Sequence, residues 1–195
     1  MKNTTKNQVI QSAIKLFAKK GFDGTSMREI AERAGVTKPM IYYHYKDKEA
    51  LYFSLLDDYM SKFIKKVMDI LSLSLSPQER IQSFVKLYVK HLKKNRNIFK
   101  IINREITGSR KNVDKLTDNY FSKIHSGLAK VINDGIKEGS FKTVNPHATA
   151  ISLIGIIIFY FAERKVIERL TDGEIQTEKL IGTLHTHILD LLLSG

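Results

Sequence analysis

The chain of 195 residues is predicted to be all-α, with about nine helices. Apolar residues recur at helical spacing along most of its length, and glycine or capping sequences separate the periodic segments. The isoleucine-rich run 151–161 could form a strand if taken alone. Its start at Asn145-Pro146 and an unbroken continuation to about Arg169 favour a helix instead. Nothing else resembles a strand.

Composition excludes several classes of protein. Without cysteine, the chain can form no disulfide, thiolate metal site or cysteine nucleophile. The N-terminus is polar, unlike a secretory signal, and the longest apolar run (150–162) is shorter than the roughly 20 residues of a membrane span. We therefore expect a cytoplasmic protein with no membrane partner. A net charge of +12 favours an anionic partner, with nucleic acid among the candidates.

Three helices are expected before residue 46. The first covers 5–20 and ends at Gly21. The sequence from Ser26 to Glu29 has the form of a capping box and opens a short helix that runs to Ala34. Gly35 suits the left-handed turn that follows, and the third helix begins with Thr37 as its expected cap.

Six longer segments with helical periodicity follow. They cover about 47–74, 77–92, 97–107, a stretch that ends at Gly139, 146–169 and 174–193. A second capping box, Ser76 to Glu79, marks the start of one of them.

The residues around 26–41 meet the steric requirements of a helix-turn-helix. Two helices that cross closely need a small residue at the crossing, which Ala31 supplies, and the turn needs a positive φ, which Gly35 allows. The pair must also pack on a third helix through apolar side chains, and those are Ile30, Ala34, Val36 and Ile41.

The same region carries a family resemblance. The matching residues are Leu16-Phe17, Gly21-Phe22, Gly24-Thr25-Ser26-Met27, Ile30-Ala31, Ala34-Gly35-Val36, Ile41-Tyr42-Tyr43-His44-Tyr45, Lys48 and Leu51. They closely resemble the TetR family of transcriptional regulators over residues 5–52. Tyr45 stands where the family pattern usually has Phe, a change compatible with packing. The resemblance implies a DNA-binding domain over 1–46 and a helical ligand-binding and dimerisation domain over 47–195.

By this resemblance, the helix from about Lys38 to Tyr43 enters the major groove of DNA. Its tyrosine hydroxyls would donate to phosphates, its lysine would neutralise them, and Met40 would reach a thymine methyl. Ile41 and Tyr45 are expected in the core. The residues implied to lie at or near DNA are Thr25, Ser26, Thr37, Lys38, Pro39, Met40, Tyr42, Tyr43, His44 and Lys48.

The larger region is expected to bind a small molecule and to form a homodimer. Aromatic and polar residues inside its helices are candidate pocket residues: Phe84, Tyr88, His91, Phe99, Ile102, Phe121, His125, Phe159 and Tyr160. The family's last two helices usually build the dimer interface. Here they would contribute Ile154, Ile158, Phe161, Leu184, Ile188 and Leu191, although the sequence does not separate the core faces from the interface faces.

Basic residues are concentrated between 86 and 111, where Glu105 is the one acidic residue. A solvated helix face explains such a cluster in most proteins. Attraction to DNA at long range and binding of an anionic ligand remain as alternatives.

The function expected is that of a homodimeric repressor, which binds a palindromic operator in double-stranded DNA and is released by an unidentified small molecule. Control by a protein partner, or activation in place of repression, are the alternatives. The six histidines lie in no metal-binding or nucleophile-activating motif, so neither an enzyme nor a metal or other cofactor is expected.

Overall fold

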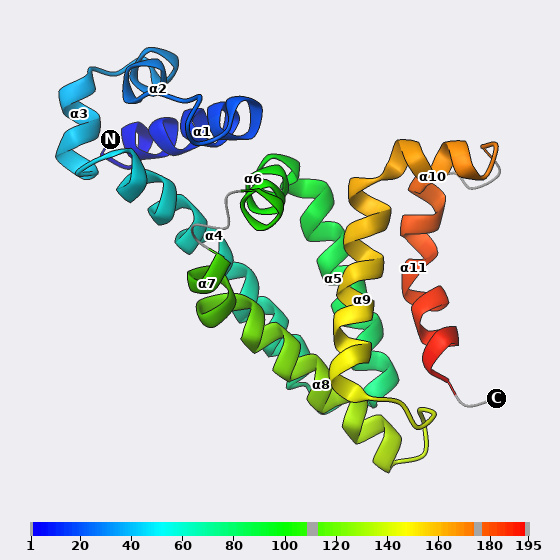
Figure 1. Cartoon of the computed structure of the whole chain (residues 1–195). Helices are drawn as coiled ribbons and strands as arrows, with labels where there is room; N and C mark the ends of the chain where they lie inside the picture. The colour runs from blue at the N-terminus through cyan, green and yellow to red at the C-terminus, as the bar shows by residue number, and fades with distance from the viewer. Residues whose placement is uncertain (1, 109–112, 174–176, 194–195) are drawn as a thin grey trace. The chain divides into compact units, whose positions relative to one another are not determined.

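The structure is a computed structural model that describes residues 2–108, 113–173 and 177–193. Figure 1 shows helices along the chain from α1 to α11. The described residues contain no β-strand, only an isolated bridge between Phe141 and Leu193. The prediction of an all-α fold is therefore confirmed. No helix in these ranges combines the length and the hydropathy that crossing a bilayer requires.

The chain folds as two compact units. The first, here called the head unit, comprises Met1–Phe63 and Asn95–Leu116. It holds α1 (Lys2–Lys20), α2 (Met27–Ala34), α3 (Lys38–His44), most of α4 (Lys48–Leu71), α6 (Arg96–Thr107) and α7 (Val113–Leu116). The second, here called the helical unit, comprises Ile64–Lys94 and Thr117–Gly195. It holds α5 (Pro77–Lys94), a π-helical turn η1 (Thr117–Phe121), α8 (Ser122–Lys137), α9 (Pro146–Ala162), α10 (Arg164–Leu170) and α11 (Thr177–Leu192).

The two compact units do not coincide with the two domains expected from the sequence, 1–46 and 47–195. Helix α6 packs on α1, and its buried Ile98 and Ile101 belong to the same core as Phe17 of α1 and Leu51 of α4. The sequence motif ends near residue 52, whereas the core beneath it also contains Ile98 and Ile101 of α6.

Two of the expected helices are interrupted. The unbroken helix expected over 146–169 was wrong, because α9 ends at Ala162 and α10 starts at Arg164. Glu163 between them has φ −105° and ψ 32°. The break falls where the apolar sequence gives way to the exposed charged residues 163–165. The helix expected before Gly139 is likewise interrupted, by the π-helical turn η1.

The core of the helical unit forms where α8 and α9 pack on α5 and where α11 packs on α5 and α9. Its fully buried side chains include Phe84, Leu128, Ile132, Ile157 and Leu184. Gly135 on α8 allows a close approach, because a Cβ added there would lie 2.2 Å from the ring of Phe141.

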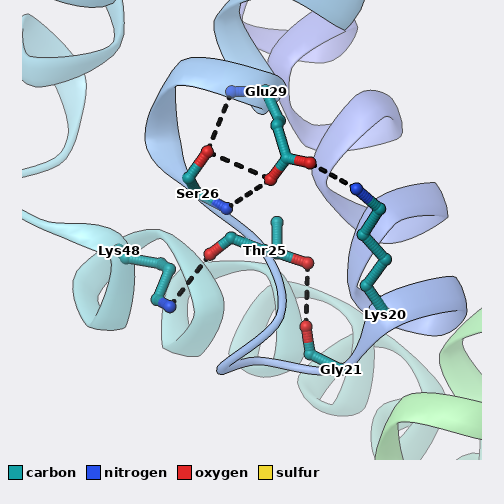
Figure 2. Close-up of polar contacts among 6 residues, drawn as sticks. All are labelled: Lys20, Gly21, Thr25, Ser26, Glu29 and Lys48. Carbon is teal, nitrogen blue, oxygen red and sulfur yellow. Dashed lines mark hydrogen bonds and ion pairs between the residues drawn. The ribbon is translucent and has the colours of Figure 1, made fainter.

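A network of polar contacts precedes α2 in the head unit (Figure 2). The Ser26 hydroxyl accepts the Glu29 backbone N–H at 3.2 Å, and the Glu29 carboxylate accepts the Ser26 backbone N–H at 2.9 Å. Lys20 of α1 forms an ion pair with the same carboxylate. The predicted capping box is thus confirmed, and the second one, between Ser76 and Glu79, is also formed.

Gly35 closes α2 in the left-handed conformation, with φ 67° and ψ 33°. Its N–H bonds to the Glu32 carbonyl, and the Val36 N–H bonds to the Ala31 carbonyl at 3.1 Å. These two bonds satisfy carbonyls that the end of the helix leaves free. The expected turn of the helix-turn-helix is confirmed, and it sets the direction in which the chain enters α3.

Replacing Gly35 with valine should destabilise the head unit by about 1–2 kcal/mol, because an L residue resists this conformation. An added Cβ meets nothing within 4 Å, so the cost comes from the backbone alone. Gly35→Asn is the control, since asparagine tolerates the left-handed region. Urea unfolding measures both variants, and equal stability of Gly35→Val and the native chain would contradict the assigned turn.

The Glu29 carboxylate should make head-unit stability depend on acid pH. Its hydrogen bond with Lys20, followed by those with Ser26, lowers its pKa from 4.5 to about 2. A lowered carboxyl pKa gives stability that is present above the ordinary value and lost as pH falls toward the folded value. Urea unfolding of the native chain should therefore show a free energy of unfolding that falls between pH 4.5 and 2. Glu29→Gln should lack this fall, and Glu32→Gln should retain it. An identical pH profile for Glu29→Gln and the native chain would refute this role.

Candidate nucleic-acid interface

Helix α3 divides its residues sharply between the core and the surface. Ile41 is fully buried and Tyr45, just after the helix, is 6% exposed. Tyr43 is 84% exposed, and Tyr42 and Met40 are each 43% exposed. Lys38, Pro39 and His44 are also exposed. The buried positions expected from the sequence are confirmed, and the remaining side chains of this short helix form one outward surface, here called the α3 surface.

The α3 surface is lined by rings and cations in mutual contact. The Lys38 ammonium lies 5.6 Å from the centre of the Tyr42 ring, within cation–π range. The rings of Tyr43 and His44 meet edge to face with centroids 5.1 Å apart. The hydroxyl of Tyr43 extends into solvent, so this surface presents hydrogen-bond donors and positive charge together.

The start of α3 differs from the expectation in one respect. Thr37 has the extended backbone of a cap, but its side chain makes no capping hydrogen bond. The Met40 N–H bonds instead to the Thr37 carbonyl at 3.1 Å. Thr37 is therefore the cap residue as expected, but its side chain makes no capping bond, and its exposed hydroxyl remains able to bind another group.

Three residues that the resemblance implied to lie at DNA make hydrogen bonds within the head unit. Thr25 is 2% exposed, and its hydroxyl donates to the Gly21 carbonyl at 2.8 Å. The Ser26 hydroxyl donates to Glu29 at 3.0 Å. The Lys48 ammonium donates to the Phe22 carbonyl at 2.8 Å and to the Thr25 carbonyl at 2.9 Å, and Figure 2 shows the second of these bonds. These hydrogen bonds are made within the unit, and contact of the three residues with DNA stays a prediction.

Lys48 ties the start of α4 to the turn before α2. Its ammonium also lies 4.3 Å from the centre of the Phe22 ring. A lysine amine with two carbonyl acceptors and an aromatic face fixes both segments at once. The α3 surface is thus supported on one side by the Gly35 turn and on the other by this contact.

Sequence reasoning missed the contacts that α6 makes within the head unit. The Tyr52 hydroxyl donates to the Glu105 carboxylate at 3.0 Å, and Glu105 is only 7% exposed. Burial, followed by the nearby carboxylate, raises the pKa of Tyr52 well above its ordinary value. Arg104 donates to the carbonyl of Phe17 near the end of α1. The one visible signal was Glu105 itself, a lone acid in a basic segment.

The candidate pocket residues are divided between the head unit and the helical unit. Phe99 and Ile102 lie on α6 of the head unit, where Ile102 packs on its core. Phe159, on α9 of the helical unit, is 50% exposed. The other six lie in the helical unit, either buried or half-buried: Phe84, Tyr88, His91, Phe121, His125 and Tyr160.

Polar groups occur inside the helical unit. Burial raises the pKa of Tyr88 to about 12, and its ring lies 5.5 Å from that of Phe84. His125 Nε2 is buried without a hydrogen-bond partner among the described residues, and its ring lies 5.1 Å from that of His147. No three metal-ligating side chains gather within the described ranges.

The candidate interface residues divide between core and surface. Leu184 and Ile188 are fully buried within their own chain, so they belong to its core. Leu191 is 45% exposed, and Ile154, Ile158 and Phe161 are half-buried. The apolar residues of α9 and α10 that are exposed are Ile151, Phe159, Val166 and Leu170.

Comparison with known families matches both parts of the chain. Residues 9–55 match the family described as bacterial regulatory proteins, tetR family. Residues 77–192 match the family described as tetracyclin repressor-like, C-terminal domain. The first range includes the capping box, the Gly35 turn and the whole α3 surface.

Individual relatives agree with these family matches. The probable HTH-type transcriptional regulator YttP of Bacillus subtilis is 30% identical over 150 residues, which cover 75% of this chain and 72% of YttP. A putative fatty acid metabolism regulator of Clostridium perfringens has a similar fold, with TM-score 0.77 and 24% identity over 96% of this chain and 100% of that one. HlyIIR, a hemolysin II transcriptional regulator, gives TM-score 0.74 at 22% identity, with both chains fully covered. The chain belongs to the TetR family, and it is a DNA-binding transcriptional regulator.

Proposed function

We propose that the protein is a homodimeric repressor that binds a palindromic operator through the α3 surface and is released by a small molecule. The observation that carries the proposal is the division of α3 into a buried face, with Ile41, and an outward face, with Tyr42 and Tyr43. A helix of this kind has no structural need for exposed aromatic side chains. Their exposure is explained by contact with another molecule.

The α3 surface suits the major groove chemically. Tyr43 and Thr37 offer hydroxyl donors to phosphate oxygens, and Lys38 neutralises phosphate charge. Met40 can contact a thymine methyl, the apolar feature of that groove. The contacts that we propose are therefore those of Thr37, Lys38, Pro39, Met40, Tyr42, Tyr43 and His44.

Dimerisation follows from the small size of the α3 surface. One short helix reads few base pairs, whereas a two-fold pair reads an inverted repeat with half-sites about one helical turn apart. Ile151 and Phe159 lie two helical turns apart on α9, with the exposed Gly155 between them. Together with Leu191 of α11, this apolar face is our proposed contact between two copies.

Release by a ligand requires that the ligand favour a form of the dimer that fits the operator poorly. Buried aromatic and polar groups of the helical unit, among them Tyr88 and His125, could line its site. Similarity to a putative fatty acid metabolism regulator makes fatty acids the first compounds to screen. Selective release of bound operator by one compound class would support this part of the proposal.

The operator can be found by incubating the protein with sheared genomic DNA of its source organism and sequencing the retained fragments. Tyr43→Ala should then weaken binding to the selected inverted repeat by about tenfold or more, since hydrogen bonds to charged groups contribute about 1.5–3 kcal/mol. Lys137→Ala, an exposed change on α8, is the matched control. Native affinity in a correctly folded Tyr43→Ala protein would remove Tyr43 from the interface.

Introducing charge into the proposed dimer contact should separate the two copies. Ile151→Glu combined with Phe159→Glu places two carboxylates on the apolar face of α9, where burial against a second copy would be costly. Sedimentation should change from dimer to monomer, and operator affinity should fall with it. Leu73→Glu, at another exposed apolar residue, should leave the dimer intact. A dimer that survives the double change would place the interface elsewhere.

A further inference from the structure

A basic groove lies between α5 and α11 in the helical unit. It has a volume of about 480 Å³ and is lined by Val85, Lys86, Val89, Lys90, Lys93, Lys94 and His185. None of the residues expected to line the ligand pocket borders it. The volume falls in the range of sites that hold small organic molecules, about 300–1,000 Å³.

The groove combines an apolar floor with a cationic rim. Val85 is 1% exposed and Val89 is half-buried, and both line the groove together with the lysines. The four lysines occupy relative positions 0, 4, 7 and 8 of α5, which place them on one face of the helix. At a rise of 1.5 Å per residue they span about 12 Å. All four are exposed.

The charge of this face is not explained by the helix that carries it. Lys93 and Lys94 lie in the last turn, where cations stabilise the carbonyl end of a helix. Lys86 and Lys90 lie further back, beyond the reach of that effect. Like charges four residues apart destabilise a helix by about 0.2–0.5 kcal/mol per pair.

Acidic partners are lacking in the described part of the chain. No ion pair there involves any of the four lysines. The one carboxylate of α5, Glu79, is engaged in the capping box with Ser76 at the other end of the helix. Burial, followed by the charges of Lys66 and Lys94, lowers the pKa of His91 on the same helix to about 4.

We propose that this groove binds a small phosphorylated compound with an apolar part. Its phosphate or pyrophosphate group would contact the lysine ammonium groups, and its apolar part would lie over Val85 and Val89. Four cations along about 12 Å match a ligand with more than one negative charge better than they match a single carboxylate. The residues proposed to join two copies, Ile151, Phe159 and Leu191, do not line this groove.

This site is separate from operator binding, so the test uses the full-length protein without DNA. Isothermal titration calorimetry measures the binding of decyl phosphate, which has both a phosphate and an apolar part, below its micelle concentration. Inorganic pyrophosphate tests charge alone, and decanol tests the apolar part alone. The variant replaces Lys86, Lys90, Lys93 and Lys94 with glutamine. Its control replaces three exposed lysines of α8, Lys123, Lys130 and Lys137, in the same way.

Decyl phosphate should bind the native protein and the α8 control equally, and should bind the groove variant about tenfold or more weakly, as the loss of several exposed charge pairs predicts. Val89→Glu, which places a carboxylate at the groove floor while keeping all four lysines, should weaken binding as well. Equal binding of decyl phosphate to the native chain and the groove variant would overturn the proposal. So would pyrophosphate binding as tightly as decyl phosphate, because the valine floor would then have no role.

One further outcome would assign the lysines to nucleic acid. If the groove variant binds decyl phosphate normally while its binding to operator loses part of its salt dependence, the lysines serve DNA and the small-molecule site is refuted. Failure to find any operator would leave the titration unaffected, since no DNA is present in it.

Discussion

The burial of Ile41 against the core of the head unit is the constraint on which the α3 surface depends. Because Ile41 is fully buried and Tyr45 nearly so, the rotation of α3 about its own axis is fixed. Burying a side chain of this size contributes about 1.5–3 kcal/mol. Tyr42 and Tyr43 then face outward as a geometric consequence, since a residue next to a buried position on a helix cannot share its face.

Two local features determine where α3 begins and how it is oriented. The Gly35 turn sets the direction between α2 and α3, and the capping box of Ser26 and Glu29 sets where α2 begins. Lys48 adds a longer connection, from the start of α4 back to the carbonyls of Phe22 and Thr25. The polar atoms of Thr25, Ser26 and Glu29 are thereby engaged within the protein, whereas the Tyr43 side chain of α3 is 84% exposed.

The sequence predicted the helix-turn-helix well because its rules are local. A capping box, a glycine turn and one small residue at a crossing can be recognised within about fifteen residues. The roles of Thr25 and Lys48 could not be predicted in this way, since their partners are backbone carbonyls whose positions depend on the fold. The same limit hid the contact between Tyr52 and Glu105, which are 53 residues apart. In the helical unit, periodicity located the helices but could not separate the core faces, where Leu184 and Ile188 are fully buried, from the faces that a second copy could contact.

Hydroxyl-radical footprinting of the tyrosine side chains, in the free protein and bound to its selected operator, tests most directly whether the α3 surface reads DNA. Tyr43 is 84% exposed and should be oxidised readily in the free protein, whereas Tyr45, 6% exposed, should react slowly in both states. Our account predicts that operator DNA protects Tyr42 and Tyr43 and leaves the slow reaction of Tyr45 unchanged. Oxidation of Tyr43 at the same rate with and without saturating operator would contradict it.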